Sequence, residues 1–176
     1  MSVLTNEQKV EILSEIVAIP SVNDNELAVA QYLAQWLNQY DIDTHIDYIS
    51  GQRANLIATI GSGKPVVAVS GHMDVVNEGN HDDWTSPPFE LTERNGHLYG
   101  RGAADMKSGL AALVIAMIEI KASGQLKNGT IKLLATAGEE MEQAGSEQLY
   151  RKGYMDDVDA LVIAEPSYPS IVYAHK

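Results

Sequence analysis

One imidazole and five carboxylates stand where this 176-residue chain could place metal ligands or acid–base groups. They are His72, Asp74, Asp105, Glu139, Glu140 and Glu165. Nitrogen and oxygen donors without thiolates suit Zn²⁺ first, with Co²⁺ or Mn²⁺ as alternatives. One carboxylate can also bridge two ions held about 3.5–4 Å apart. The set therefore predicts a site for divalent metal, with room for one or two ions.

Two pairs within this set suggest distinct roles. In extended chain Asp74 points the same way as His72, so its carboxylate could fix the imidazole tautomer or ligate the same ion. Glu139 and Glu140 are adjacent on a turn, which lets one bind an ion while the other stays free as a base. A metal-assisted hydrolase needs that division, because the ion lowers the pKa of water and the free carboxylate takes its proton.

Each acid also has an ordinary explanation by itself. Asp105 could cap a helix, Glu139 and Glu140 could be a solvated pair in a loop, and Glu165 could be a surface acid. Convergence of all these acids on one place would not fit these ordinary explanations, because carboxylates gathered at one edge of a sheet raise one another's pKa values unless cations neutralise them. We therefore favour a metal site over independent capping and surface roles.

The elements that must position these residues alternate between strands and helices. Apolar runs and period-two alternation predict strands at 44–49, 55–60, 65–70, 130–137, 160–164 and 171–174. Helical spacing predicts a helix from a capping box at Thr5 and Gln8 to Pro20, and others at 25–40, 107–123 and 145–151. This order is typical of an α/β fold with a mostly parallel sheet and helices on both faces, in which ligands gather at the carboxyl ends of strands.

The turns carry their own signals. A hairpin turn is predicted at 61–64, between the second and third strands, and another at Asn95-Gly96. Gly100 and Gly102 indicate a backbone that bends sharply to deliver Asp105.

Composition sets the class of protein. With 45% hydrophobic and 20% charged residues the chain is globular, and with no cysteine it has neither disulfides nor thiolate ligands. Its net charge of -12 argues against nucleic acid or an anionic membrane as partner, since both need clustered Lys and Arg. No apolar run approaches the roughly 20 residues of a membrane span, and a signal peptide is not evident. A cytoplasmic protein is the expectation.

Five segments together resemble one enzyme family. They are SGHMDVV at 70–76, the stretch from Trp84 to Phe89, LYGRGAADMKSGLAA at 98–112, TAGEEMEQAGS at 136–146 and AEPS at 164–167. Through them essentially the whole chain is similar to the N-terminal half of the zinc-dependent aminoacylase and peptidase family. That family includes succinyl-diaminopimelate desuccinylase, acetylornithine deacetylase and glutamate carboxypeptidase, so the resemblance implies a zinc-peptidase-like catalytic domain.

The resemblance also implies a role for each metal ligand. His72 and Glu165 would ligate one zinc ion. Glu140 would ligate the other, and Asp105 would bridge the two. A non-proline cis peptide bond would follow Asp105.

The catalytic residues that the resemblance implies are Asp74, which would orient His72, and Glu139, as the general base. The substrate would be a small N-acyl amino acid of the desuccinylase or deacetylase type, cleaved at its amide bond by an activated water. Two alternatives stay open: a di- or tripeptidase or carboxypeptidase of the same family, and a non-catalytic metal-binding or interaction module. Glu139 favours an enzyme, because a non-catalytic homologue has no use for an unligated acid beside a ligand.

Members of this family are much longer than this chain. Residues 1–176 would be the N-terminal part of the catalytic domain, without the lid or dimerisation domain and without the part that supplies a late histidine ligand. We expect this chain to keep the site of His72, Asp105 and Glu165, to hold the second ion weakly or not at all and to have little or no hydrolase activity. The parent protein is expected to be a homodimer, and an open sheet edge here would invite pairing with another chain.

Overall fold

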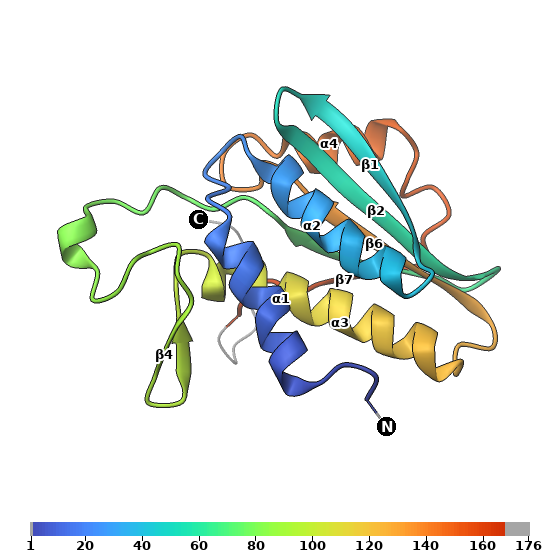
Figure 1. Ribbon diagram of the computed structural model, residues 1–176. Helices are drawn as coiled ribbons and strands as arrows, with labels where there is room; N and C mark the ends of the chain where they lie inside the picture. The colour runs from blue at the N-terminus through green and yellow to red at the C-terminus, as the bar shows by residue number, and fades with distance from the viewer. Residues whose placement is uncertain (1, 168–176) are drawn as a thin grey trace.

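The computed structural model describes residues 2–167, in which helices cover both faces of a sheet (Figure 1). The helices are α1 Asn6–Ala18, α2 Glu26–Gln39, α3 Ser108–Ser123 and α4 Ala144–Arg151. The strands are β1 Asp43–Ser50, β2 Arg53–Ser62, β3 Val66–His72, β4 Thr92–Arg94, β5 His97–Tyr99, β6 Gly129–Thr136 and β7 Ala160–Ile163. The predicted elements are present with small shifts at their ends, while the strand predicted at 171–174 lies outside the described residues.

The first helix begins and ends as its sequence predicts. The hydroxyl of Thr5 accepts the Gln8 N–H at 3.2 Å, and the Gln8 side chain accepts the Thr5 N–H at 2.9 Å, which completes the capping box. α1 ends at Ala18, two positions before Pro20, whose ring nitrogen has no hydrogen to donate.

The five strands of the main sheet within residues 2–167 are arranged in the order β1-β2-β6-β3-β7. β6, β3 and β7 are parallel, whereas β1 with β2 and β2 with β6 are antiparallel. The layered α/β fold is therefore confirmed, but the sheet is mixed and not mostly parallel. The tight turn at Gly51 and Gln52 leaves β1 and β2 no room for the crossover that parallel pairing needs.

One predicted hairpin is wrong and the other is confirmed. β2 and β3 do not pair across 61–64, because β6 lies between them: Ile131 of β6 has Ile60 of β2 on one side and Val67 of β3 on the other. β4 and β5 do form a hairpin around Asn95-Gly96. Its two turn residues have φ values of +53° and +75°, as a type I′ turn requires.

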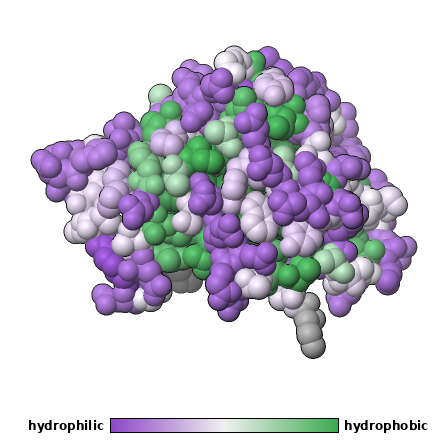
Figure 2. Space-filling model, viewed as in Figure 1, coloured by the Kyte–Doolittle hydropathy of each residue, from purple (hydrophilic) through white to green (hydrophobic). Residues whose placement is uncertain are grey.

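Two apolar clusters join the three layers. The larger one lies between the sheet and α1, α2 and α3, and the smaller one, of Ile57, Ala68, Leu134 and Leu149, lies between the sheet and α4. Trp36 belongs to the larger cluster and donates its indole N–H to the Tyr32 hydroxyl at 2.9 Å, and Tyr32 packs against the same cluster. The outer side of the helical layer is mostly hydrophilic (Figure 2).

β7 forms one edge of the sheet in the part of the chain that the structure describes. The side chains of Leu161, Val162 and Ile163 on it are 43%, 52% and 57% exposed. An apolar edge strand of this kind offers free backbone groups to another segment or chain. None of the helices between residues 2 and 167 has the length and apolarity to cross a membrane.

Glu119 of α3 fixes the N-terminal segment. Its carboxylate accepts the N–H groups of Val3 and Leu4 at 2.8 and 3.3 Å and the Ser2 hydroxyl, and it lies 3.3 Å from the Lys9 ammonium. The hydrogen bonds from Ser2 and then Val3 lower the pKa of Glu119 from 4.5 to about 2. Because the pKa is lower in the folded chain, the carboxylate stabilises the fold above pH 4.5 and loses this effect as the pH falls toward 2.

Replacing Glu119 by Gln is therefore expected to release the N-terminal segment at neutral pH. Amide hydrogen exchange at Val3 and Leu4 should become faster, because the neutral side chain cannot accept their N–H groups as strongly. In the unchanged chain the protection of these amides, relative to the intrinsic exchange rate at the same pH, should fall in the same way as the pH drops toward 2. Glu15→Gln, on the exposed side of α1, is the control. Equal exchange rates at Val3 and Leu4 in both variants would contradict this role of Glu119.

Candidate metal centre

Three parallel strands bring their carboxyl ends to one edge of the sheet. His72 is the last residue of β3 and is in register with Thr136 at the end of β6. Glu139 and Glu140 follow β6 by a short turn, and Glu165 follows β7. Four of the predicted site residues therefore come to the edge where an open α/β sheet places its ligands.

The imidazole of His72 is the centre of this group. Its Nε2 lies 3.1 Å from Asp105 Oδ1, 3.8 Å from Glu139 Oε2 and 3.8 Å from Glu165 Oε1, while the side chain is only 1% exposed. Ligand atoms of His72, Asp105 and Glu140 all lie within 4.8 Å of one another. The structure thus brings together all four residues proposed as metal ligands and the proposed base.

Asp105 reaches the site through a turn that glycine makes possible. The turn Ala103–Lys107 precedes α3, and Gly102 before it has a left-handed φ of +78°. A Cβ on Gly102 would lie 2.4 Å from Val75 Cγ1, and one on Gly100 would lie 2.8 Å from Val17 Cγ1. The bend expected at Gly102 is confirmed, whereas Gly100 is required by its close packing against Val17. The cis peptide bond between Asp105 and Met106 is also confirmed.

Gly102→Ala is expected to weaken metal binding as well as the fold. A left-handed φ costs a residue with a Cβ about 1–2 kcal/mol, and the contact with Val75 would also shift the turn that carries Asp105. Gly96→Ala is the matched control, since Gly96 has a φ of +75° and its added Cβ would meet nothing within 4 Å. Calorimetric Zn²⁺ titration should reveal weaker binding for Gly102→Ala alone; equal binding by both variants would contradict this role.

Asp74 is buried beside His72, but its carboxylate has a different contact from the one predicted. The ring Nδ1 of His72 is 2.9 Å from the main-chain oxygen of Asp74, while the nearest carboxylate oxygen is 3.6 Å away. The carboxylate instead accepts the N–H groups of Glu139 and Glu140 at 3.1 and 3.0 Å. The reason is that the chain turns after β3, so the carbonyl of Asp74 meets the ring and its side chain meets the turn after β6.

This arrangement still fixes the tautomer of His72. A carbonyl oxygen can only accept, so in the neutral ring Nδ1 carries the hydrogen and Nε2 keeps its lone pair. Nε2 is the atom that faces Asp105 and Glu165. The imidazole is therefore oriented as a ligand toward the acids.

The acids of the site repel one another. Burial, followed by the charge of Asp105, raises the pKa of Glu140. Burial also raises the pKa of Glu165 to about 7, and the charges of Asp105 and Glu139 contribute. A divalent cation would relieve this repulsion, and one imidazole with three carboxylates is a donor set that Zn²⁺, Co²⁺ or Mn²⁺ accepts. The residues present fit the predicted metal site.

Lys107 is a structural residue of this region that sequence reasoning missed. It is fully buried, and its ammonium donates to the carbonyls of Ile16 and Ile19 at 2.6 and 2.9 Å. The helical donor for the Ile16 carbonyl would be the nitrogen of Pro20, which has no hydrogen. Pro20 and the DMK motif were both visible in the sequence, but nothing local joins them.

A cavity of about 510 Å³ opens beside the candidate metal ligands. His72, Glu139 and Glu165 lie in its wall together with Met106 and Ile163. It combines the candidate base, metal ligands and apolar surface in one space, as a substrate site requires.

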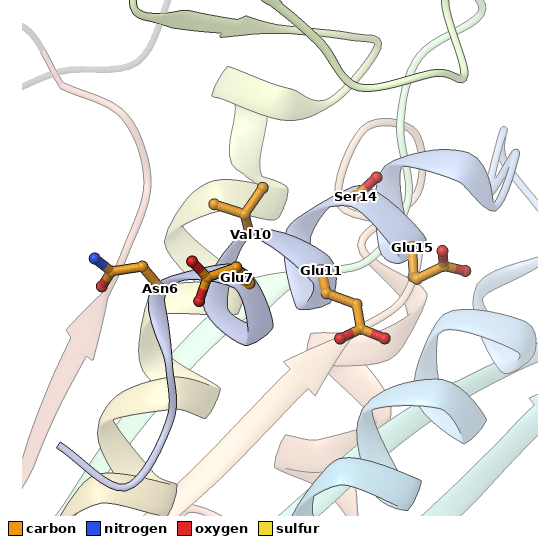
Figure 3. A pocket seen from close by; sticks show the side chains of 6 residues that line it. All are labelled: Asn6, Glu7, Val10, Glu11, Ser14 and Glu15. Carbon is orange, nitrogen blue, oxygen red and sulfur yellow. The ribbon is translucent and has the colours of Figure 1, made fainter.

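A second depression, of about 540 Å³, runs along α1 (Figure 3). All its residues come from that one helix, and the carboxylates of Glu7, Glu11 and Glu15 spread away from one another. It contains no histidine and no converging ligands. We therefore assign it no chemistry.

Two bacterial proteins are similar to this chain in sequence. A probable succinyl-diaminopimelate desuccinylase of Staphylococcus epidermidis is 57% identical over 176 residues, which are 100% of this chain and 44% of that protein. A succinyl-diaminopimelate desuccinylase of Wolbachia pipientis is 35% identical over 161 residues, 90% of this chain and 40% of that protein. The chain thus spans less than half the length of these relatives.

A solved structure and a family model also match this chain. The crystal structure of human carnosine dipeptidase 1 has a TM-score of 0.77 and 28% identity, over 92% of this chain and 39% of that one. Residues 68–174, more than half of the chain, match the model of Peptidase family M20/M25/M40. The chain therefore belongs to peptidase family M20/M25/M40.

Proposed function

We propose that residues 1–176 are the N-terminal part of the catalytic domain of a metal-dependent hydrolase that cleaves amide bonds. The observation that carries this proposal is the convergence on His72 Nε2 of carboxylates from three separate segments, Asp105, Glu139 and Glu165. The raised pKa values of Glu140 and Glu165 support it, because the burial and crowding of acids that raise them are what a bound divalent cation would offset.

Two divalent ions, Zn²⁺ first and Co²⁺ or Mn²⁺ as alternatives, would be held by the four ligands. His72 and Glu165 would hold one ion and Glu140 the other, with Asp105 between them. When bound, such ions polarise a substrate carbonyl and lower the pKa of water.

Glu139 would be the general base. Its carboxylate is 47% exposed, lies in the cavity wall and is 3.8 Å from His72 Nε2. It would take the proton of the attacking water and deliver it to the leaving amine. Asp74 would keep this carboxylate in place, because it holds the N–H groups of both Glu139 and Glu140.

The proposed substrate is a small N-acyl amino acid, with a succinyl group as the first candidate. The names of the relatives that cover the whole chain, at 57% and 53% identity, support this choice. A dipeptide is the second candidate, supported by the likeness to human carnosine dipeptidase 1. We also propose that the longer protein is a homodimer of the cytoplasm.

Metal titration of this chain tests the proposal. Zn²⁺ added to the metal-free chain in a calorimeter should bind, and His72→Ala and Asp105→Ala should weaken that binding by at least about 100-fold, the upper end of what losing an outer-shell partner costs. His97→Ala and Asp83→Ala, at exposed positions outside the site, are the matched controls. If all four variants bind Zn²⁺ equally well, the site is wrongly assigned. N-succinyl amino acids and dipeptides, offered to a protein of the relatives' length that carries this sequence, then separate the two substrates.

A further inference from the structure

The turn that carries Glu139 and Glu140 is shaped by contacts from outside it. This turn, residues 137–145, leads from the end of β6 through the first two residues of α4 and contains two left-handed residues, Gly138 with a φ of +73° and Gln143 with a φ of +56°. The Gln143 N–H donates to the Gly138 carbonyl at 2.6 Å. Met141, the large apolar side chain of the turn, is 68% exposed and anchors nothing. Packing of the turn's own side chains therefore does not fix its shape.

Asn55 of β2 ties the two ends of the turn together. Its Oδ1 accepts the Ala137 N–H at 3.1 Å, and its Nδ2 donates to the Gly145 carbonyl at 3.1 Å. The side chain is fully buried, and a Cβ on Gly145 would lie 2.4 Å from Asn55 Oδ1. A primary amide suits this place because it offers a donor and an acceptor side by side.

Arg53 reaches the middle of the same turn. It precedes Asn55 by two residues in β2, so both side chains emerge on the same face of the sheet. A Cβ on Gly138 would lie 2.0 Å from Arg53 Nη2, which means that the guanidinium occupies the space beside this glycine. Its Nη1 lies 3.7 Å from Glu142 Oε2, two residues after Glu140.

A buried acid holds Arg53 from the other side. Glu26, at the start of α2, has a fully buried side chain, and its Oε1 lies 3.5 Å from Arg53 Nε. Neither carboxylate oxygen of Glu26 has a hydrogen-bond partner among residues 2–167. Because the carboxylate of Glu26 is buried and has no hydrogen-bond partner in the described part of the chain, it holds the guanidinium of Arg53 close. Separating the two groups would leave an isolated charge in the interior.

We propose that Asn55 and Arg53 are positioning residues for the metal centre: from β2 they hold the backbone on either side of Glu139 and Glu140, without touching metal or substrate. Asp74, two residues after β3, holds the same turn through the N–H groups of Glu139 and Glu140. The turn is thus fixed between β2 and the segment that follows β3, and the two glutamates lie close to His72. This inference rests on the proposed function only where it takes Glu140 as a metal ligand.

A Zn²⁺ titration with matched variants of this chain tests the proposal. Outer residues that orient metal ligands typically contribute about 10- to 100-fold to metal affinity, so Asn55→Ala should weaken Zn²⁺ binding at least about tenfold. Arg53→Lys keeps the positive charge beside Glu26 but not the flat guanidinium beside Gly138, so it should bind more weakly than the unchanged chain and more tightly than Arg53→Met.

The control separates positioning from general destabilisation. Thr130→Val removes a buried hydroxyl that donates to the Gly63 carbonyl at 2.8 Å, at the opposite end of β6. It should lower thermal stability and leave the Zn²⁺ affinity unchanged. Amide exchange at Glu139 and Glu140 in the metal-free chain should be faster in Asn55→Ala than in Thr130→Val.

The outcomes distinguish this proposal from the proposed function. If the unchanged chain binds Zn²⁺ and the Asn55 and Arg53 variants bind it as well as Thr130→Val does, the positioning role is refuted. If no variant binds Zn²⁺, the proposed metal site is refuted, and amide exchange at Glu139 and Glu140 still tests the positioning role. Equal rates in Asn55→Ala and Thr130→Val refute that role, and faster rates in Asn55→Ala support it. If Asn55→Ala does not fold, Arg53→Lys, which keeps the positive charge beside Glu26, gives the same decision.

Discussion

Glu139→Gln is expected to reduce the hydrolysis rate constant about 1,000-fold, within the range of about 10²–10⁴ that a general base contributes. Glutamine has the same shape but cannot take a proton, whereas the proposed ligands His72, Asp105, Glu140 and Glu165 remain. Metal content should therefore stay nearly the same. The measurement is kcat together with metal analysis, in a protein of the relatives' full length that carries this sequence.

The control for this prediction is Glu147→Gln, an exposed acid of α4 that pairs with Arg151. It should leave both kcat and metal content unchanged. A Glu139→Gln protein that keeps its full rate would exclude Glu139 as the base. If the same change removed the metal, Glu139 would be a ligand, and the assignment of the two adjacent glutamates would have to be reversed.

Lys107→Met is expected to lower the free energy of unfolding by about 2–3 kcal/mol, because a buried acceptor left without its donor costs about 1–3 kcal/mol. Methionine keeps the apolar stem but supplies no hydrogen to the Ile16 and Ile19 carbonyls. Ile19 keeps the N–H of Ser21 at 2.8 Å, so most of the loss comes from Ile16. Urea unfolding of the metal-free chain measures it.

The choice of pH matters for this measurement. Burial lowers the pKa of Lys107 to about 7, and at pH 8 the amine is largely neutral while it still has two hydrogens to donate. The comparison at pH 8 therefore tests the hydrogen bonds and not the burial of a charge. Lys121→Met, at an exposed position of α3, is the control. A Lys107→Met chain as stable as this control would contradict the prediction, because it would mean that water molecules donate to the Ile16 and Ile19 carbonyls in place of Lys107.

Local sequence determined the elements and the edge at which chemistry would gather. The capping box at Thr5, the Asn95-Gly96 turn and the apolar runs before His72 and Glu165 each act over a few residues, and each was found where it was predicted. Parallel strands then bring their carboxyl ends to one edge whatever their order. The residues of the candidate site could therefore be named from the sequence.

The tertiary structure alone decided which distant segments meet. The sequence does not encode locally that β6 enters between β2 and β3, so the predicted hairpin at 61–64 failed and the sheet proved to be mixed. It also gave no sign that Asp74 would hold the turn of Glu139, or that Asn55 would hold its ends.

The physical reason is the same in each case. Turn and cap signals arise from neighbours in the chain, whereas the partner of a buried amide or carboxylate is chosen by packing across the sheet. Lys107 and Ile16 are 91 positions apart, yet they meet because a proline leaves one carbonyl without a donor. The sequence by itself determined which groups could do the chemistry, and the packing of the strands decided what holds them in place.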